Sequence, residues 1–267
     1  MSIAIVTSTS HRHYFFAVEI AKHFDTRAVF LEPKTFKPQS VGKNEEENEV
    51  LERWFSDWAA TEKNFFGDAK GQLSSLVDQV APLKRGEINS DDFIKSFKAL
   101  SLELLIVFGS SILRPEVFQS CSGAAFNLHL GISPFYRGSA TNFWAIYDGR
   151  PGYVGATIHL LDSGIDSGPI VRTGRPQVSV CETPHSLGCK AIQVGTKLMI
   201  ESITEYFQGG LKSKPQTGET MRLCKRRDFS AQSVRQVERH VSEDLFAQFI
   251  AEGAPGPASI VPINFAH

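Results

Sequence analysis

The chain has 267 residues, of which 42% are hydrophobic and 21% charged, a composition typical of a globular protein with one large domain. Its net charge of −1 lacks the basic excess of most nucleic-acid-binding proteins. No apolar run could span a bilayer, and the N-terminus does not resemble a signal peptide, so we expect a cytoplasmic protein without nucleic-acid or membrane partners. The four cysteines lack zinc-ligand spacing, so no metal is expected.

The first hundred residues open with a β-α-β unit and then change in character. Residues 3–6 and 27–31 are predicted strands, and apolar residues at helical spacing over 15–24 predict a helix between them. A helical connection of this kind favours a parallel sheet. Residues 33–100 are dense in charge and predict several helices, which we interpret as a helical insert.

The sheet is predicted to resume at residues 104–108, a continuous apolar run typical of a strand buried on both faces. Further strands are expected at 124–130, 154–161 and 169–180, and helices from 115, over 141–147, over 183–207 and over 230–250. This alternation predicts an open, mostly parallel Rossmann-like α/β sheet flanked by helices, which binds ligands at the carboxyl ends of its strands. We expect a catalytic domain over 1–210 and a short, mainly helical C-terminal extension over 211–267.

Two polar residues interrupt the otherwise apolar strand at 124–130. Asn127 and His129 are two positions apart, so the period of a strand places both side chains on one face. A lone Asn or His on a strand is usually a hydrogen-bonded structural residue. The pair, at the carboxyl end of a strand, is a candidate site.

A second polar stretch, His159 to Val171, carries Asp162 and Asp166 in a glycine-rich loop between two strands. Glycines such as Gly164 permit tight turns and close approach of backbone to a ligand. A carboxylate beside an imidazole orients the ring and raises its pKa. An Asp in such a loop is more often an Asx-turn residue, so from the residues alone an Asn/His/Asp site stays a hypothesis.

Together the two stretches resemble the formyltransferase family that includes glycinamide ribonucleotide transformylase, methionyl-tRNA formyltransferase and the nucleotide-sugar N-formyltransferases. That family carries Asn-x-His on a strand and, later, an Asp-x-Gly-x-Asp-x-Gly-Pro loop. Between them lies a loop that is matched here by Ser133, Pro134, Tyr136, Arg137 and Gly138. The resemblance runs from about residue 104 to residue 198 and leaves residues 33–100 and the C-terminal tail uncovered.

The resemblance implies that N10-formyltetrahydrofolate is the formyl donor and that Asn127, His129 and Asp166 are catalytic. When an amine attacks the formyl carbon, Asn127 would donate a hydrogen bond to the tetrahedral oxyanion. His129 would donate a second bond or shuttle the proton, and Asp166 would hold His129. The sequence shows no covalent nucleophile paired with a base, which favours direct transfer without a metal.

The resemblance also places the folate pterin against the loop at residues 107–117. Backbone groups near Ser110, Ile112 and Leu113 would bind it, and the backbone around Asp162 and Gly164 would close the other side. The alternative interpretation is an ordinary strand-to-helix turn with Leu113 in the core.

The acceptor is expected to be a nucleotide-linked 4-amino-4,6-dideoxy sugar such as GDP-perosamine, used in O-antigen and lipopolysaccharide synthesis, because residues 126–144 resemble that branch most closely. Hydroxyornithine, glycinamide ribonucleotide and methionyl-tRNA are alternative acceptors, and a non-catalytic folate- or nucleotide-binding protein is an alternative of another class. A Rossmann dehydrogenase is disfavoured because Thr7-Ser8-Thr9-Ser10 replaces the G-x-G-x-x-G motif.

Five side chains are candidates for binding this acceptor. A helix N-terminus after the first strand can hold phosphate, and Arg137 and Asn142 follow the catalytic strand. The residues at that helix N-terminus are Ser10, His11 and Arg12. Ser10 fits the role of a helix cap equally well. A homodimer through residues 169–180 and the C-terminal segment is as compatible with the sequence as a monomer.

Overall fold

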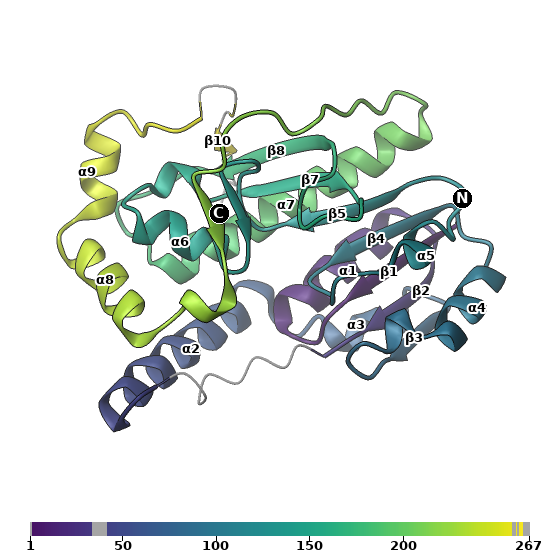
Figure 1. Cartoon of the computed structure of the whole chain (residues 1–267), viewed down its shortest axis with the longest axis horizontal. Helices are drawn as coiled ribbons and strands as arrows, with labels where there is room; N and C mark the ends of the chain where they lie inside the picture. The colour runs from purple at the N-terminus through teal and green to yellow at the C-terminus, as the bar shows by residue number, and fades with distance from the viewer. Residues whose placement is uncertain (1, 34–41, 258–259, 261, 264–267) are drawn as a thin grey trace.

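A single large sheet organises the molecule, as the computed structural model shows for residues 2–33, 42–257, 260, 262 and 263 (Figure 1). Within these residues the strand order is β10-β8-β7-β5-β4-β1-β2-β3. Neighbouring strands pair in parallel except where β7 pairs with β5 and with β8. The strands are β1 (Ile3–Thr7), β2 (Thr26–Leu31), β3 (Gln79–Pro82), β4 (Leu104–Phe108), β5 (Ala125–His129), β7 (Ala156–Leu160), β8 (Ile170–Pro176) and β10 (Pro262–Ile263). The predicted open, mostly parallel sheet is confirmed.

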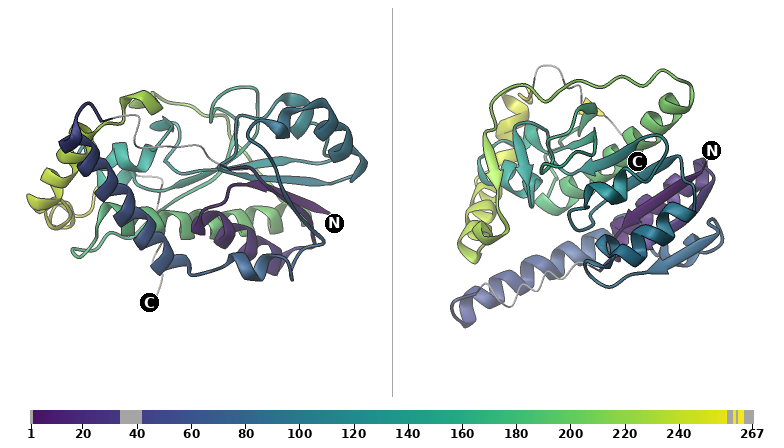
Figure 2. Two further views of the ribbon diagram at one scale, coloured as in Figure 1. Left: turned by 90° about the horizontal axis from the view of Figure 1, so that it is seen from below. Right: turned by 45° about the vertical axis from the view of Figure 1, so that its right-hand side comes forward.

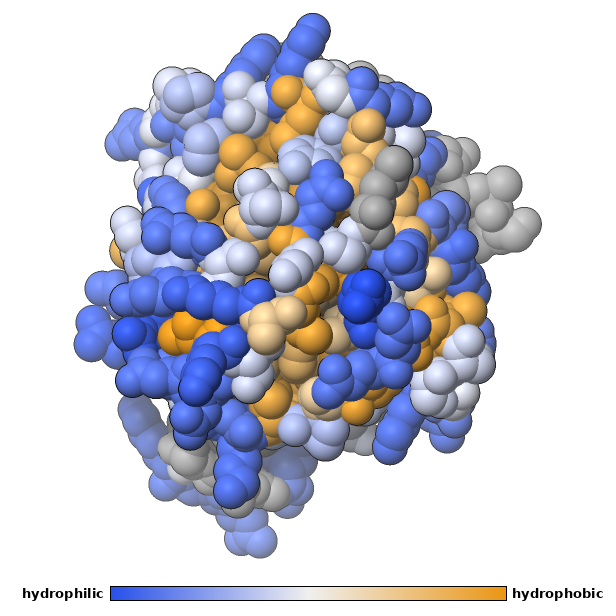
Figure 3. Space-filling view, turned by 90° about the vertical axis from the view of Figure 1, so that its right-hand side faces the viewer, coloured by the Kyte–Doolittle hydropathy of each residue, from blue (hydrophilic) through white to orange (hydrophobic). Residues whose placement is uncertain are grey.

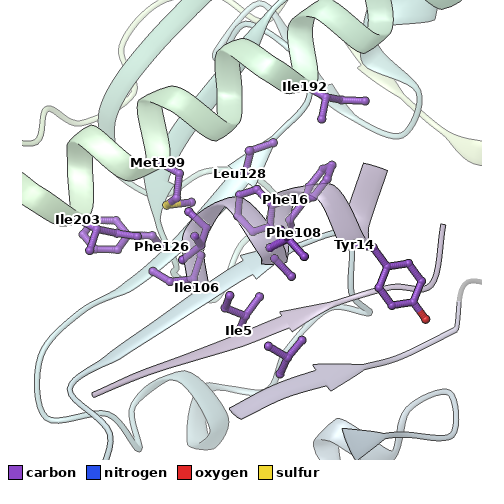
Figure 4. Close-up of a cluster of buried hydrophobic side chains, with 14 of the residues drawn as sticks. Ile5, Tyr14, Phe16, Ile106, Phe108, Phe126, Leu128, Ile192, Met199 and Ile203 are labelled. Carbon is purple, nitrogen blue, oxygen red and sulfur yellow. The ribbon is translucent and has the colours of Figure 1, made fainter. Parts of the chain in front are cut away.

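Helices α1 (His11–His23) and α7 (Pro184–Phe207) cover one face of this sheet (Figures 1 and 2). The core between them and the strands contains Phe16, Ile106, Phe126, Leu128 and Met199, which lie close together in Figure 4. Each such side chain stabilises the fold by roughly 1.5–3 kcal/mol when it leaves water. Because neighbouring strand residues point to opposite faces, the other side chains of β5 face away from α7.

A second apolar core lies on the opposite face, under α4 (Asp91–Ala99) and α5 (Pro115–Phe118). A third core packs four helices together at one end of the molecule (Figure 1). These are α2 (Glu45–Phe66), α6 (Thr141–Tyr147), α8 (Ala231–Ser242) and α9 (Leu245–Ala251). On the side of the molecule in Figure 3, apolar patches are separated by hydrophilic side chains. No helix in the described part of the chain has the length and apolar character needed to cross a bilayer.

The prediction of a helical insert over residues 33–100 is wrong in one respect. Residues 33–100 contain α2, α3 (Lys70–Leu73) and α4, but also β3, which extends the sheet beyond β2. β3 has only four residues and little burial, so it lacks the apolar alternation by which a strand is predicted. Residues 34–41 of this segment lie outside the described residues.

The C-terminal extension also differs from the prediction. One helix over 230–250 was expected, but α8 and α9 are separate because Asp244 adopts a left-handed conformation with φ of 60°. Two strands tie the extension to the rest of the chain: β10 pairs with β8, and β9 (Arg222–Cys224) pairs with β6 (Tyr136–Gly138). Residues 258–259, 261 and 264–267 of the expected extension lie outside the described residues.

Candidate active site

Asn127 and His129 lie on the face of β5 that points away from α7, because Phe126 and Leu128 occupy the α7 side. In the antiparallel pair with β7, Asn127 is directly opposite His159 and His129 is opposite Thr157. Directly opposed residues project from the same face of a sheet. The topology therefore gathers two imidazoles, one amide and one hydroxyl at the end of β5.

The Asn127 amide is oriented by His159. The His159 ring contacts the Leu160 carbonyl through Nδ1 at 2.9 Å, which places the proton of the neutral ring on Nδ1. Nε2 is then an acceptor, and it lies 3.0 Å from Asn127 Nδ2. One N–H of the amide is thereby used, and no other partner of this amide is found among the described residues. The second N–H can serve as a hydrogen-bond donor to a ligand.

His129 is almost completely buried, with an exposed fraction of 5%, and both of its ring nitrogens face acceptors. Nε2 lies 3.0 Å from the Tyr136 carbonyl oxygen, and Nδ1 lies 3.3 Å from Asp166 Oδ2. Burial lowers the pKa of His129, although Asp166 and the Tyr136 carbonyl offset part of that effect. A neutral ring can donate only one hydrogen bond, so the longer contact, to Asp166, is the weaker of the two.

Asp166 closes the group from the loop between β7 and β8. Its Oδ2 accepts a hydrogen bond from the Gly138 N–H at 3.2 Å, and its Oδ1 lies 3.7 Å from His159 Nε2. Burial alone would raise the pKa of Asp166, but the His129 and His159 rings and the Gly138 N–H together lower it to about 2. The carboxylate is therefore charged at neutral pH and faces both imidazoles.

Comparison with known proteins shows the family of the chain. A family model described as formyl transferase matches residues 55–203, more than half of the chain. The chain belongs to the formyl transferase family. The matched region begins inside α2, so the expectation that residues 33–100 lie outside the resemblance is wrong from residue 55 onward.

Members of the formyl transferase family resemble the chain in different ways. The methionyl-tRNA formyltransferase of Thermodesulfovibrio yellowstonii is 34% identical over 134 residues, which are 50% of this chain and 43% of that relative. The match thus spans less than half of the relative's length. A Mycobacterium tuberculosis protein described as a likely sugar N-formyltransferase has a TM-score of 0.57 at 19% identity, covering 85% of this chain and 76% of that one. A sugar 3N-formyl transferase, solved in the presence of dTDP and 5-N-formyl-THF, has a TM-score of 0.52 at 16% identity, covering 86% and 71%.

Within this formyl transferase fold, the loop expected to hold the pterin follows β4. The Ser110 hydroxyl contacts the Ser111 carbonyl, the Ile112 side chain is 71% exposed, and the Leu113 side chain is buried in the core under α4 and α5. The alternative interpretation of Leu113 as a core residue is thus confirmed for its side chain. Any contact of Leu113 with a ligand would have to come from its backbone.

The loop between β7 and β8, expected on the other side of the pterin, is shaped by Asp162. The Asp162 carboxylate accepts hydrogen bonds from the Gly164 N–H at 3.0 Å and the Ser167 hydroxyl at 2.9 Å. This is the Asx-turn that such sequences favour. A Cβ at Gly164 would lie 2.0 Å from Ser167 Oγ, so a larger residue there would displace the hydroxyl that binds Asp162. Ile165, at the tip of the loop, is 53% exposed.

The expected acceptor-binding side chains after β1 have protein partners. Ser10 Oγ contacts His13 Nδ1 at 2.6 Å, and His11 Nδ1 contacts the Gly67 carbonyl at 2.8 Å. Arg12 forms an ion pair with Glu62 and lies over the Trp58 ring. The His11 contact links α1 to the residue that ends α2, and the Arg12 contacts link α1 to α2 itself. Glu62 neutralises the charge of Arg12, whereas the Ser10 contact stays at the start of α1.

The two candidates after β5 differ from each other. Asn142 pairs with both the N–H and the carbonyl of Gly155 at 3.0 Å, so its amide holds a loop in place. Arg137 donates to the Ile165 carbonyl at 2.5 Å, while its Nε is buried without a partner among the described residues. Of the five candidates, Arg137 alone contacts the loop that carries Asp166.

Sequence reasoning missed His159 as a member of the site. The signal was present, because His159 stands in an apolar strand two residues from Thr157, just as His129 stands two residues from Asn127. The antiparallel pairing of β5 with β7, which brings the two pairs together, is not visible in the sequence.

Proposed function

We propose that the chain is an N-formyltransferase that transfers the formyl group of N10-formyltetrahydrofolate directly to the amine of a nucleotide-linked amino sugar. The observation that carries the proposal is the group formed by Asn127, His129, His159 and Asp166 at the end of β5, in a chain of the formyl transferase family. It combines an N–H donor, a buried imidazole and a charged carboxylate, which suits the transfer of an acyl group to an amine.

Each side chain has a distinct role in this proposal. The Asn127 N–H that His159 leaves unused would stabilise the oxyanion that forms when the amine attacks the formyl carbon. His129 would take the proton from the attacking amine through Nδ1 as its 3.3 Å contact with Asp166 opens. Asp166, charged at neutral pH, would stabilise the imidazolium that results.

The formyl donor would bind between the loops after β4 and after β7. It supplies an activated formyl group, and its pterin is a ring system whose faces can pack against apolar side chains and whose edges carry hydrogen-bonding groups. The two loops each expose one large apolar side chain, Ile112 and Ile165, which such a ring would cover. The backbone of Ser110, Ile112 and Leu113 on one side and of Asp162 and Gly164 on the other would supply the polar contacts.

An anionic acceptor is favoured by basic residues on β6 and directly after β9. Arg137 contacts the loop of Asp166, and β9, which runs beside β6, leads directly into Lys225, Arg226 and Arg227. These charges suit the diphosphate of a nucleotide sugar better than free hydroxyornithine. GDP-perosamine is the acceptor we would test first. Methionyl-tRNA is a second candidate, because the curated relatives with which the sequence aligns are methionyl-tRNA formyltransferases.

The test is release of tetrahydrofolate from N10-formyltetrahydrofolate with a panel of acceptors. The panel contains GDP- and dTDP-linked 4-amino-4,6-dideoxy sugars, hydroxyornithine, glycinamide ribonucleotide and methionyl-tRNA, and an Asn127→Ala variant serves as the inactive control. Turnover with one amino sugar, at least 100-fold faster than with the other acceptors, is expected. Preferred turnover of another acceptor would reject the sugar, and no turnover with any of them would reject the proposed activity.

A further inference from the structure

Gln216 holds the loop of Asp166 from a part of the chain that the family model does not cover. Its Nε2 donates hydrogen bonds to the carbonyl oxygens of Asp166, at 2.7 Å, and Gly168, at 2.9 Å. The family match ends at residue 203. Gln216 thus lies in the segment between α7 and β9, within the predicted C-terminal extension.

The amide of Gln216 can take only one orientation. If it were reversed, Oε1 would face two carbonyl oxygens, all three of them acceptors, so Nε2 must point toward the loop. Oε1 is buried without a partner among the described residues. The hydrogen bonds of the Gln216 side chain are therefore directed at the loop of Asp166, and the side chain does not bridge the loop to another polar group.

The backbone of Asp166 is in a conformation that needs such support. Its φ of 47° lies in the left-handed region, which is strained for a residue other than glycine. This conformation directs the carboxylate toward His129 and His159. A donor that binds the carbonyls of residues 166 and 168 at once fixes the turn between them.

Gln216 is itself held in place on both sides. Two residues earlier, Lys214 exchanges backbone hydrogen bonds with Ile170 at 2.7 and 2.8 Å, at the first residue of β8. Downstream, β9 pairs with β6, which contains the Gly138 whose N–H binds Asp166 Oδ2. The segment from Lys214 to Cys224 thus runs past the Asp166 loop with a fixed register.

We propose that Gln216 is a positioning residue for the reaction, which sets the place of the Asp166 carboxylate through the backbone of its loop. This inference rests on the proposed function, since it assigns Asp166 a part in catalysis. Without the two hydrogen bonds the loop can relax, and a displacement of about 1 Å in a reacting group can cost on the order of 100-fold in rate.

The central test is a double-mutant cycle between Gln216→Met and Asp166→Asn, measured as release of tetrahydrofolate. Gln216→Met keeps the length of the side chain and removes both hydrogen bonds. It should lower kcat roughly 10- to 100-fold and leave KM for both substrates within about threefold. In the Asp166→Asn background the same change should lower kcat less than about twofold, because the carboxylate to be positioned is absent.

Gln248→Met is the matched control. Gln248 donates to a backbone carbonyl, that of Glu243, at 2.7 Å, but in α9 and away from the site, so kcat should stay at the wild-type value. Gln216→Glu brings a carboxylate against two carbonyls, and its rate relative to the wild type should rise as the pH is lowered and the new group becomes a donor.

A measurement that needs no acceptor substrate separates this inference from the proposed function. The imidazole ¹⁵N resonances of His129, assigned with His129→Ala, should shift in Gln216→Met and not in Gln248→Met. Wild-type kcat in Gln216→Met, equal losses in both backgrounds of the cycle, or unchanged His129 resonances would each overturn the positioning role. An inactive wild-type protein with shifted His129 resonances in Gln216→Met would reject the proposed function alone.

Discussion

Replacing Asp166 by Asn tests the electrostatics of the site through the stability of the fold. The folded protein lowers the pKa of this carboxyl from 3.8 to about 2, which corresponds to roughly 2 kcal/mol at about 1.4 kcal/mol per pKa unit. Because the folded pKa lies below the unfolded one, this stability is present above pH 3.8 and is lost as the pH falls toward 2. Asn has nearly the same shape and tolerates the left-handed φ of 47°, so the change removes mainly the charge.

We therefore expect Asp166→Asn to lower the free energy of unfolding by about 2 kcal/mol at pH 7. For a protein of this size that is a drop in Tm of roughly 4–8 °C. Urea unfolding at pH 7, 5, 4 and 3 should show that the difference in unfolding free energy between the variant and the wild type becomes smaller below pH 4. In a His129→Gln background the gap should be smaller, because the ring that lowers the pKa is missing. Equal stability of the two proteins at pH 7, or a gap that stays constant down to pH 3, would refute the reasoning.

Three further predictions follow from the geometry. His159→Leu removes the acceptor that orients the Asn127 amide and should lower kcat about 10- to 100-fold, as measured by release of tetrahydrofolate; a rate within twofold of the wild type would contradict that role. Since burial lowers the pKa of His129, a mechanism that uses the neutral ring predicts that kcat/KM stays constant from pH 7 through 6.5, and a pH profile with a half-loss at 6.5 or above would contradict it. Gly131→Ala places a Cβ 2.7 Å from His129 Nε2 at a φ of 155° and should abolish activity and lower Tm, whereas Gly188→Ala, which has open space in α7, should keep both or raise Tm slightly.

The parts of the fold that the sequence predicts well are those with strong local patterns. The apolar run at residues 104–108 is β4, and the helix at 141–147 is α6, both with the predicted bounds. Residues 183–207 predict α7 to within one residue, helped by Thr183, whose side chain caps the helix, and by Gly209 after its end. In each case the signal is a run of five or more residues, continuously apolar in β4 and with apolar residues at helical spacing in α7.

The strands at the edges of the sheet show where such patterns fail. β3 and β10 have four and two residues, and within the described residues each pairs with one neighbouring strand, so packing imposes little pattern on them. β9 is only three residues long and pairs with β6, far away in the sequence. The left-handed φ of Asp244, which separates α8 from α9, has no Gly or Asn to mark it.

The candidate site likewise contains residues that local sequence patterns predict and contacts that they do not. Asn127 and His129 were predicted because they interrupt an apolar strand, and the structure places them, as expected, on one face of β5. The candidates after β1 were proposed from their position at a helix N-terminus. The sequence could not show that Glu62 pairs with Arg12, since the two are 50 residues apart.

The same long-range contacts determine how the candidate site is assembled. Hydrogen bonds that bring its parts together join residues 28, 32 and 50 positions apart: Gly138 with Asp166, Asn127 with His159, and Asp166 with Gln216. The first two of these bonds need the strands β5 to β7 and their loops in place, whereas the third also needs the segment after α7, so the geometry of Asp166 depends on the order of the C-terminal segment. A substitution there that loosens the chain without unfolding the sheet should therefore reduce turnover before it reduces the global stability. We therefore propose that the C-terminal segment acts together with the catalytic residues, although the family model ends before it.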